Sequence, residues 1–422
     1  MAKDVKRLGI IMWVLVVTYY LYQYILRVSP SVMADEIMAG FKLDAHGFGA
    51  LSAIATLFYA LLQIPAGILS DLFGARRMVL TSILLCTGGV ALFSITDSLY
   101  LAYLARALIG SGSACAFLCV SKIASDWFSV EKKSLMFALT VAVGTCGALI
   151  GSAPLSKMNE TYGWRGSFYL LAGLGIVIFI LNLLFLRDRA DTAHQETATS
   201  RYEIWTSIKQ IFKSRFCWMY AIVALGIYLS ISVFADLWGV SFIMVKYGLS
   251  KAVAAQAVSM IYVGTAIGVI SIAWFSTFFK DRRPIIGGSA LLIASLLALI
   301  VFGNVNSTWS IYVIMFSIGF FAGGEVLCFT SACEVMSVSI AATVTGFINF
   351  IVTLGAAFIQ KQIGHLLHSL WDGTLTEAGL PFYTVQNYQS AMSILIALTF
   401  GSFVLSFFLN RSAKLALTEA IH

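Results

Sequence analysis

Apolar residues run along the chain in long stretches separated by short polar breaks. About 20 mostly apolar residues in a helix are enough to cross the hydrocarbon core of a bilayer. The pattern predicts an all-α membrane protein with twelve transmembrane helices, over 9–36, 47–69, 77–96, 99–122, 135–156, 166–186, 216–240, 253–277, 284–303, 309–332, 342–366 and 389–410.

One longer charged segment interrupts this pattern, and six of the predicted helices lie on each side of it. We therefore predict an N-terminal six-helix bundle over 1–186, a cytoplasmic linker over 187–215 and a C-terminal six-helix bundle over 216–422.

The composition excludes the soluble classes of protein. Hydrophobic residues make up 59% of the chain and charged residues only 11%, against about 45–50% and about 25% in soluble domains. The seven cysteines are scattered within or beside apolar runs, which indicates packing rather than disulfides or a metal site. No P-loop, G-x-S-x-G or H-E-x-x-H motif occurs. We therefore expect no enzyme, no cofactor and no metal.

Lysines and arginines alternate in abundance from one predicted loop to the next. With a cytoplasmic N-terminus, 18 of them fall on the cytoplasmic side and 5 on the opposite side. Positive residues are retained in the cytoplasm during insertion, so both termini are expected there. The net charge of +7 then follows from topology and requires no nucleic-acid partner. We expect a multi-pass plasma membrane protein, in a bacterial inner membrane.

A short motif recurs in the two halves. GILSDLFGARR closes the second predicted helix of the first half, and WFSTFFKDRRP closes the second predicted helix of the second half. Asp71 and Asp281 are thereby 210 residues apart at matching positions. Duplicated six-helix halves are typical of secondary transporters that bind their substrate between the halves.

The first of these segments resembles the signature G-x-L-x-D-x-x-G-x-R-R of the major facilitator superfamily, with matching residues Gly67, Asp71, Gly74, Arg76 and Arg77. The pattern Arg106-x-x-x-Gly110 and the triplet Gly163-Trp164-Arg165 are similar to segments of the same family. The resemblance implies two six-helix bundles that rock to give alternating access, with the signature residues acting in that change.

The first predicted helix carries a polar face inside the membrane. Tyr20, Gln23, Tyr24 and Arg27 share this face, which predicts that it lines a wet cavity. A guanidinium binds carboxylate or phosphate with two parallel hydrogen bonds, so we expect an anionic or zwitterionic solute. The helix resembles that of organophosphate/phosphate antiporters, which use a second arginine in helix 7. That arginine is missing here, which favours a single carboxylate.

Other polar residues fall on helices that line the cavity in this family. We predict further substrate contacts from Tyr59, Tyr228, Tyr262 and Asn349. Proton coupling or a counter-charge is assigned to Glu325 and Arg106, because an ionisable residue within a span is costly and therefore a functional candidate. Gating contacts are expected from Asp126, Asp281 and Glu334, and from Asp236 near the outer end of helix 7.

These features predict a secondary transporter that moves an amino acid, short peptide or organic acid by proton symport. Its expected partners are the solute, the proton and the lipid bilayer, and we expect a monomer. The alternatives are an organophosphate exchanger, a metabolite or siderophore exporter, a facilitated uniporter, and a non-transporting membrane sensor with a transporter fold.

Overall fold

The computed structural model describes residues 2–128, 130–188, 209–279, 281–336, 340–376, 379 and 381–409. The chain divides into two compact units. Unit 1 comprises Met1–Glu196 with Ser250–Ala255, and unit 2 comprises Thr197–Leu249 with Gln256–His422. Each unit is a bundle of helices, in agreement with the fold class predicted from the apolar pattern.

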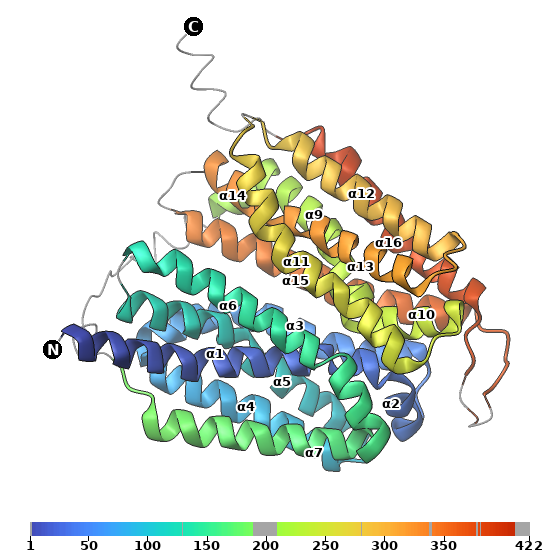
Figure 1. The fold of residues 1–422 in the computed structure, drawn as a ribbon, viewed down its shortest axis with the longest axis horizontal. Helices are drawn as coiled ribbons and strands as arrows, with labels where there is room; N and C mark the ends of the chain where they lie inside the picture. Colours follow the sequence, from blue (N-terminus) through green and yellow to red (C-terminus); the bar gives the residue numbers. More distant parts are fainter. Residues whose placement is uncertain are drawn as a thin grey trace, which may run out of the picture. The chain divides into compact units, whose positions relative to one another are not determined.

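The first half of the chain forms unit 1 (Figure 1). In this unit α5 packs against α1, α3 and α4, and α7 packs against α4 and α1. The helices are α1 Ala2–Val32, α2 Ala34–Phe41, α3 Ala45–Phe73, α4 Ala75–Ile95, α5 Leu99–Trp127, α6 Val130–Ile150 and α7 Ala153–Phe185.

Unit 2 contains helices that change their hydrogen-bonding pattern part-way along. A π-helical segment separates α9 from α10, and a 3₁₀ segment separates α13 from α14. The elements of the second half of the chain are α9 Arg215–Leu229, η2 Ser230–Trp238, α10 Gly239–Tyr247, α11 Lys251–Ser276, α12 Arg283–Phe302, α13 Thr308–Ala322, η3 Gly323–Glu325, α14 Val326–Val335, α15 Ala341–Ser369 and α16 Val385–Ser406. The first five residues of α11 belong to unit 1.

Eleven helical stretches within the described residues are long and apolar enough to cross a membrane. One of them, Leu139–Phe185, has 47 residues. As a single straight helix it would be about 70 Å long, more than twice the hydrocarbon thickness of about 30 Å. The helix α6 ends at Ile150 and α7 begins at Ala153. Gly163 (φ 70°, ψ 169°) then interrupts α7 with a non-helical backbone conformation. This stretch therefore accounts for two of the twelve predicted spans.

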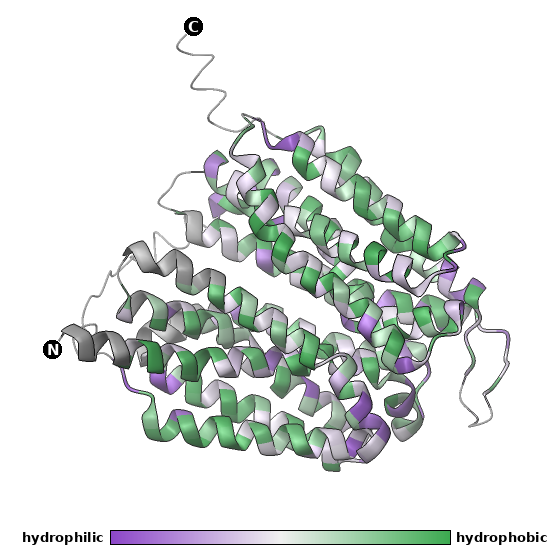
Figure 2. Ribbon diagram, in the orientation of Figure 1, coloured by the Kyte–Doolittle hydropathy of each residue, from purple (hydrophilic) through white to green (hydrophobic). Residues whose placement is uncertain are grey.

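Hydrophobic residues run along the helices, whereas hydrophilic residues gather toward their ends (Figure 2). The second part of α7 exposes large apolar side chains, among them Leu174, Val177, Leu181 and Leu184. Exposed apolar surface over the length of a helix is unfavourable in water and favourable in lipid. The surface of α7 therefore fits the predicted bilayer environment.

Helices in equivalent positions pack in the same way within each unit. In unit 1 the third long helix, α4, packs against the last, α7, and the first, α1, packs against α6. In unit 2 α12 packs against α16, and α9 packs against α15. The same helix pairs therefore pack together in both units, as expected of two copies of one six-helix arrangement. The repeated sequence motif points to the same duplication.

Glycines allow α11 and α13 to cross at close range within unit 2. A Cβ atom on Gly264 would collide with the carbonyl oxygen of Phe316, and one on Gly319 with that of Ile261. Small residues spaced by four let helix backbones approach in this way in membranes. These glycines therefore have a packing role.

Candidate functional site

The polar face of α1 gathers an arginine and two tyrosines in unit 1. The hydroxyl of Tyr20 donates a hydrogen bond to the hydroxyl of Tyr24 (3.3 Å), and the two ring centroids are 5.1 Å apart. The Arg27 guanidinium carbon lies 5.6 Å from the centroid of the Tyr24 ring, within cation–π range. Gln23 is buried on the same helix. The helical spacing that predicted this face therefore places its charged and aromatic groups together.

Residues of two other helices complete this cluster. Tyr59 of α3 lies near Tyr24 and Arg27, and Gln63 of the same helix is within hydrogen-bonding reach of its hydroxyl. On the α6 side, a Cβ on Gly144 would approach the Tyr20 ring to 2.7 Å. The absence of a side chain at Gly144 therefore leaves room for the tyrosines of α1.

The α1 cluster, defined as Tyr20, Tyr24, Arg27 and Tyr59, suits the binding of an oxyanion. Its guanidinium supplies paired N–H donors, and the phenols supply single O–H donors. Arg27 is half-buried, so part of the group remains accessible. Four of the predicted substrate residues thus lie in one place.

Arg106 occupies a different environment in α5. Only 5% of its surface is exposed, and no carboxylate of the described residues pairs with its guanidinium. An unpaired buried cation is costly in a membrane segment. Its predicted role as a counter-charge stays a prediction.

The predicted residues Tyr228, Tyr262, Asn349 and Glu325 all belong to unit 2. Tyr228 lies near the end of α9, Asn349 lies in α15 and both are half-buried. Glu325 closes the 3₁₀ segment η3, directly after Gly323 and Gly324. A 3₁₀ stretch inside a helix often marks a hinge. Glu325 is half-buried.

Tyr262 has a role that the sequence pattern did not predict. Its hydroxyl donates a 2.7 Å hydrogen bond to Oδ1 of Asp236, which lies in η2 and is 4% exposed. Asp236 therefore lies in the interior of unit 2, and its partner Tyr262 is 26 residues away on another helix. An aspartate inside an apolar run was the signal available in the sequence.

On the predicted cytoplasmic side, the turn of the signature motif joins α3 to α4. Gly74 has φ 80°, which favours glycine. The backbone N–H of Arg76 donates to Asp188 (2.9 Å), and its guanidinium donates to the carbonyl of Leu183 at the end of α7 (2.9 Å). Arg77 is exposed. The motif therefore ties the start of α4 to the end of α7.

Three other predicted gating residues fall outside what the structure describes. Gly67 and Asp71 lie within α3 and Asp126 within α5, but their side chains are not among the described residues. Their predicted roles therefore stay predictions.

The corresponding segment of unit 2 carries two ion pairs. Arg283 pairs with Asp281 (2.7 Å), and Arg282 pairs with Glu334 (2.9 Å). The second pair joins the start of α12 to the end of α14. Asp281 and Glu334 therefore take part in ion pairs, and their predicted gating role stays a prediction.

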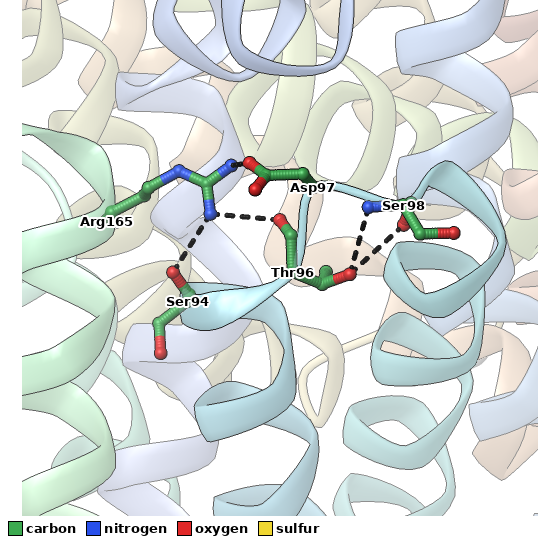
Figure 3. Close-up of polar contacts among 5 residues, drawn as sticks. All are labelled: Ser94, Thr96, Asp97, Ser98 and Arg165. Atoms are coloured by element: carbon green, nitrogen blue, oxygen red, sulfur yellow. Dashed lines mark hydrogen bonds and ion pairs between the residues drawn. The ribbon is translucent and has the colours of Figure 1, made fainter.

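Cations also hold the opposite ends of α4 and α12. Arg165 of α7 donates to the carbonyls of Ser94 (3.2 Å) and Thr96 (2.9 Å) at the end of α4, and it pairs with Asp97 (Figure 3). In unit 2, Nζ of Lys246 donates to three carbonyls at the end of α12, those of Ile300, Val301 and Gly303. A positive charge at a helix C-terminus is favourable because it meets unpaired carbonyls and the helix dipole.

Comparisons with known proteins place this architecture among membrane transporters. A family model described as the Major Facilitator Superfamily matches residues 12–359. A solved bacterial homologue of the human lysosomal transporter Spinster, in an inward-facing and occupied conformation, has a TM-score of 0.75 at 15% identity and covers 95% of this chain and 96% of its own. This likeness confirms the predicted fold.

Two relatives are similar to this chain over most of their length. The membrane sensor protein UhpC of Escherichia coli is 25% identical over 412 residues, covering 90% of this chain and 89% of its own. A probable galactarate/D-glucarate transporter of Bacillus subtilis, GudP, is 22% identical over 339 residues, covering 71% of this chain and 72% of its own.

Proposed function

Since the chain belongs to the major facilitator superfamily, we propose that it is a secondary active transporter for organic acids, driven by protons. The single observation that carries the substrate class is the α1 cluster, where Arg27 lies against Tyr24 within a group of phenols. One guanidinium with several O–H donors binds a carboxylate and neighbouring hydroxyls better than an uncharged solute.

Sugar acids fit this chemistry best among the predicted solutes. A hydroxylated carboxylate offers both an anion for Arg27 and hydroxyls for Tyr20, Tyr24 and Tyr59. The similarity to GudP supports the same class. Amino acids and short peptides also carry a carboxylate, and they enter the test as competing solutes.

The first test is a thermal-shift screen of the purified protein with D-glucarate, galactarate, glutamate, dialanine and glucose 6-phosphate. A ligand that binds the folded state stabilises it by mass action. We expect D-glucarate or galactarate to raise the unfolding temperature of the wild type and to have little effect on Arg27→Ala.

Arg27→Lys serves as the matched variant, because it keeps the charge but loses the two-pronged geometry. We expect it to bind the sugar acid more weakly than the wild type and more strongly than Arg27→Ala. Equal stabilisation of all three proteins would contradict a role for Arg27 in binding, and stabilisation by glucose 6-phosphate alone would contradict the proposed substrate class.

A membrane sensor is the second candidate, and the similarity to UhpC over nine-tenths of the chain favours it. Uptake into proteoliposomes separates the two functions. A transporter accumulates or exchanges radiolabelled D-glucarate across the membrane, whereas a sensor binds it without net movement. Binding in the thermal-shift screen without uptake or exchange would favour the sensor.

The remaining elements of the proposal concern topology. The distribution of lysine and arginine supports an inner-membrane protein with both termini in the cytoplasm. On that orientation the contacts of Arg76 and the Arg282–Glu334 pair face the cytoplasm. Accessibility of single cysteines placed at exposed Arg77 and in the 370–384 loop to an impermeant reagent tests this orientation directly.

A further inference from the structure

We propose that Asp236 is the group that binds the transported proton and that Tyr262 is its hydrogen-bond partner. The inference rests on the proposed proton-driven transport and names the residue that carries the proton. It favours Asp236 over Glu325, the carboxylate that the sequence pattern singled out.

The backbone around Asp236 has an unusual form. The nine residues of η2, Ser230–Trp238, are π-helical and all are buried. The N–H of Gly239 bonds the carbonyl of Phe234, five residues earlier, as a π-helix requires. π-helical turns are rare and are frequent at functional sites, since they reorient side chains and relax the regular hydrogen-bond ladder.

A side-chain amide of α15 holds this segment in place. Nε2 of Gln360 donates to the carbonyl of Ser232 (2.8 Å) and to its hydroxyl (3.4 Å). In return, the indole N–H of Trp238 donates to the backbone carbonyl of Gln360 (3.3 Å). These contacts brace η2 on both sides of Asp236 with neutral groups.

The hydrogen bond to Tyr262 suits a carboxyl group that changes its protonation state. The phenol donates to Asp236 at 2.7 Å. After a proton forms an O–H bond on Asp236, the phenol oxygen can accept a hydrogen bond from that acid. Tyr262 can therefore pair with either form, and it carries no charge that would hold Asp236 permanently ionised.

Burial provides the sensitivity to water that proton coupling needs. Asp236 is 4% exposed, so the ionised form has lost almost all of its hydration. Low dielectric disfavours a charged carboxylate, whereas access of water to the site favours it. A change in access during transport would therefore drive uptake of a proton on one side of the membrane and its release on the other.

Titratable side chains occur on every element that packs against η2. Tyr262 of α11 faces Asp236 directly. The other titratable side chains on the elements packed against η2 are Arg215, Cys217, Tyr220 and Tyr228 of α9, Lys246 and Tyr247 of α10, Lys251 of α11, Tyr312 of α13, and Lys361, His365 and His368 of α15. Lys246 is engaged with three carbonyls of α12.

Infrared spectroscopy tests proton binding without any solute. Purified wild type is titrated from mildly alkaline to acidic buffer, and the carbonyl stretch of a protonated carboxylic acid is followed. We expect an acid band that is missing in Asp236→Asn, kept in Glu325→Gln and shifted in frequency in Tyr262→Phe. An identical titration in the wild type and Asp236→Asn would overturn the proposal, and so would loss of the band in Glu325→Gln alone.

Transport in proteoliposomes tests coupling, with radiolabelled D-glucarate as the solute. A gradient of one pH unit supports about tenfold accumulation of a solute that moves with one net proton. We expect Asp236→Asn, which mimics the protonated acid, to lose this accumulation and to keep exchange of internal for external D-glucarate. Full accumulation by Asp236→Asn would refute the assignment.

Two further variants separate coupling from folding. Asp236→Glu keeps the acid, and we expect it to keep some gradient-driven accumulation even if Asp236→Asn folds poorly. Gln360→Ala removes the brace, and we expect it to lower stability while the acid band remains. If the wild type transports no D-glucarate, the proposed function fails, yet the infrared titration still decides whether Asp236 binds a proton.

Discussion

The crossing of α11 and α13 gives a prediction whose size follows from the structure. An alanine methyl at Gly264 would meet the carbonyl of Phe316, and one at Gly319 would meet the carbonyl of Ile261. These are backbone atoms, so no side-chain rotation relieves the clash. Overpacking lowers the free energy of unfolding by about 1–3 kcal/mol. Because the added methyl meets backbone atoms, we expect these variants near the upper end of that range. Alanine regains about 1 kcal/mol through helix propensity, which leaves a net loss of about 2 kcal/mol.

The measurement is the unfolding temperature of the detergent-purified protein, followed by tryptophan fluorescence. A loss of about 2 kcal/mol lowers it by about 4–8 °C for a unit of this size. Gly288 of α12 is the matched control, because a Cβ there meets no atom within 4 Å. We expect Gly288→Ala to leave the unfolding temperature unchanged or to raise it slightly. Gly264→Ala and Gly288→Ala with equal unfolding temperatures would refute the close crossing.

A double variant sharpens the test. Gly264→Ala and Gly319→Ala both force the same two helices apart, so the second substitution should cost less than it does alone. Additive losses would instead indicate two independent sites and would contradict a single crossing.

Three other predictions concern helix ends, each followed by thermal unfolding in detergent. Arg165→Gln should lower the free energy of unfolding by about 2 kcal/mol, since it loses charge-assisted hydrogen bonds to two helix-terminal carbonyls. Asp97→Asn should lower it by less than about 0.5 kcal/mol, because the Asp97 side chain is 93% exposed. Equal losses of stability in the two variants would contradict this ordering. Gly163→Ala should cost about 1–3 kcal/mol, because φ 70° with ψ 169° is a backbone region that essentially only glycine adopts, and no loss would show that the kink relaxes. Thr384→Ala should cost about 1 kcal/mol, because its hydroxyl completes a capping box with Asn387, and Thr384→Ser should restore the cap.

The helices and their approximate ends could be predicted from the sequence, because a bilayer imposes a minimum length of apolar residues on every span. The face of α1 could also be predicted, since one helical period fixes which residues lie together, and Tyr20, Tyr24 and Arg27 do. Contacts between neighbours on one helix need no knowledge of tertiary packing.

The irregular segments could not be predicted. A π-helical turn at Ser230–Trp238 and a 3₁₀ turn at Gly323–Glu325 occur in stretches whose hydropathy is that of an ordinary span. The hydrogen bond between Asp236 and Tyr262 joins two helices, so its existence depends on their rotation, which an apolar run does not specify. Arg165 and Lys246 bind the ends of α4 and α12, and these contacts also depend on how neighbouring helices pack.

The two irregular segments share a feature that bears on coupling, since each contains an acidic residue. Asp236 lies in η2 and Glu325 closes η3. A π or 3₁₀ turn releases carbonyls from the regular ladder, and these carbonyls need donors, as Ser232 obtains from Gln360. A segment held by exchangeable side-chain donors can change its pairing at lower cost than a continuous α-helix. The described cluster of cation and phenols lies in unit 1, whereas these acids lie in unit 2. Substitutions in the α1 cluster should therefore change solute affinity, and substitutions at Asp236 in η2 should change the response to a pH gradient.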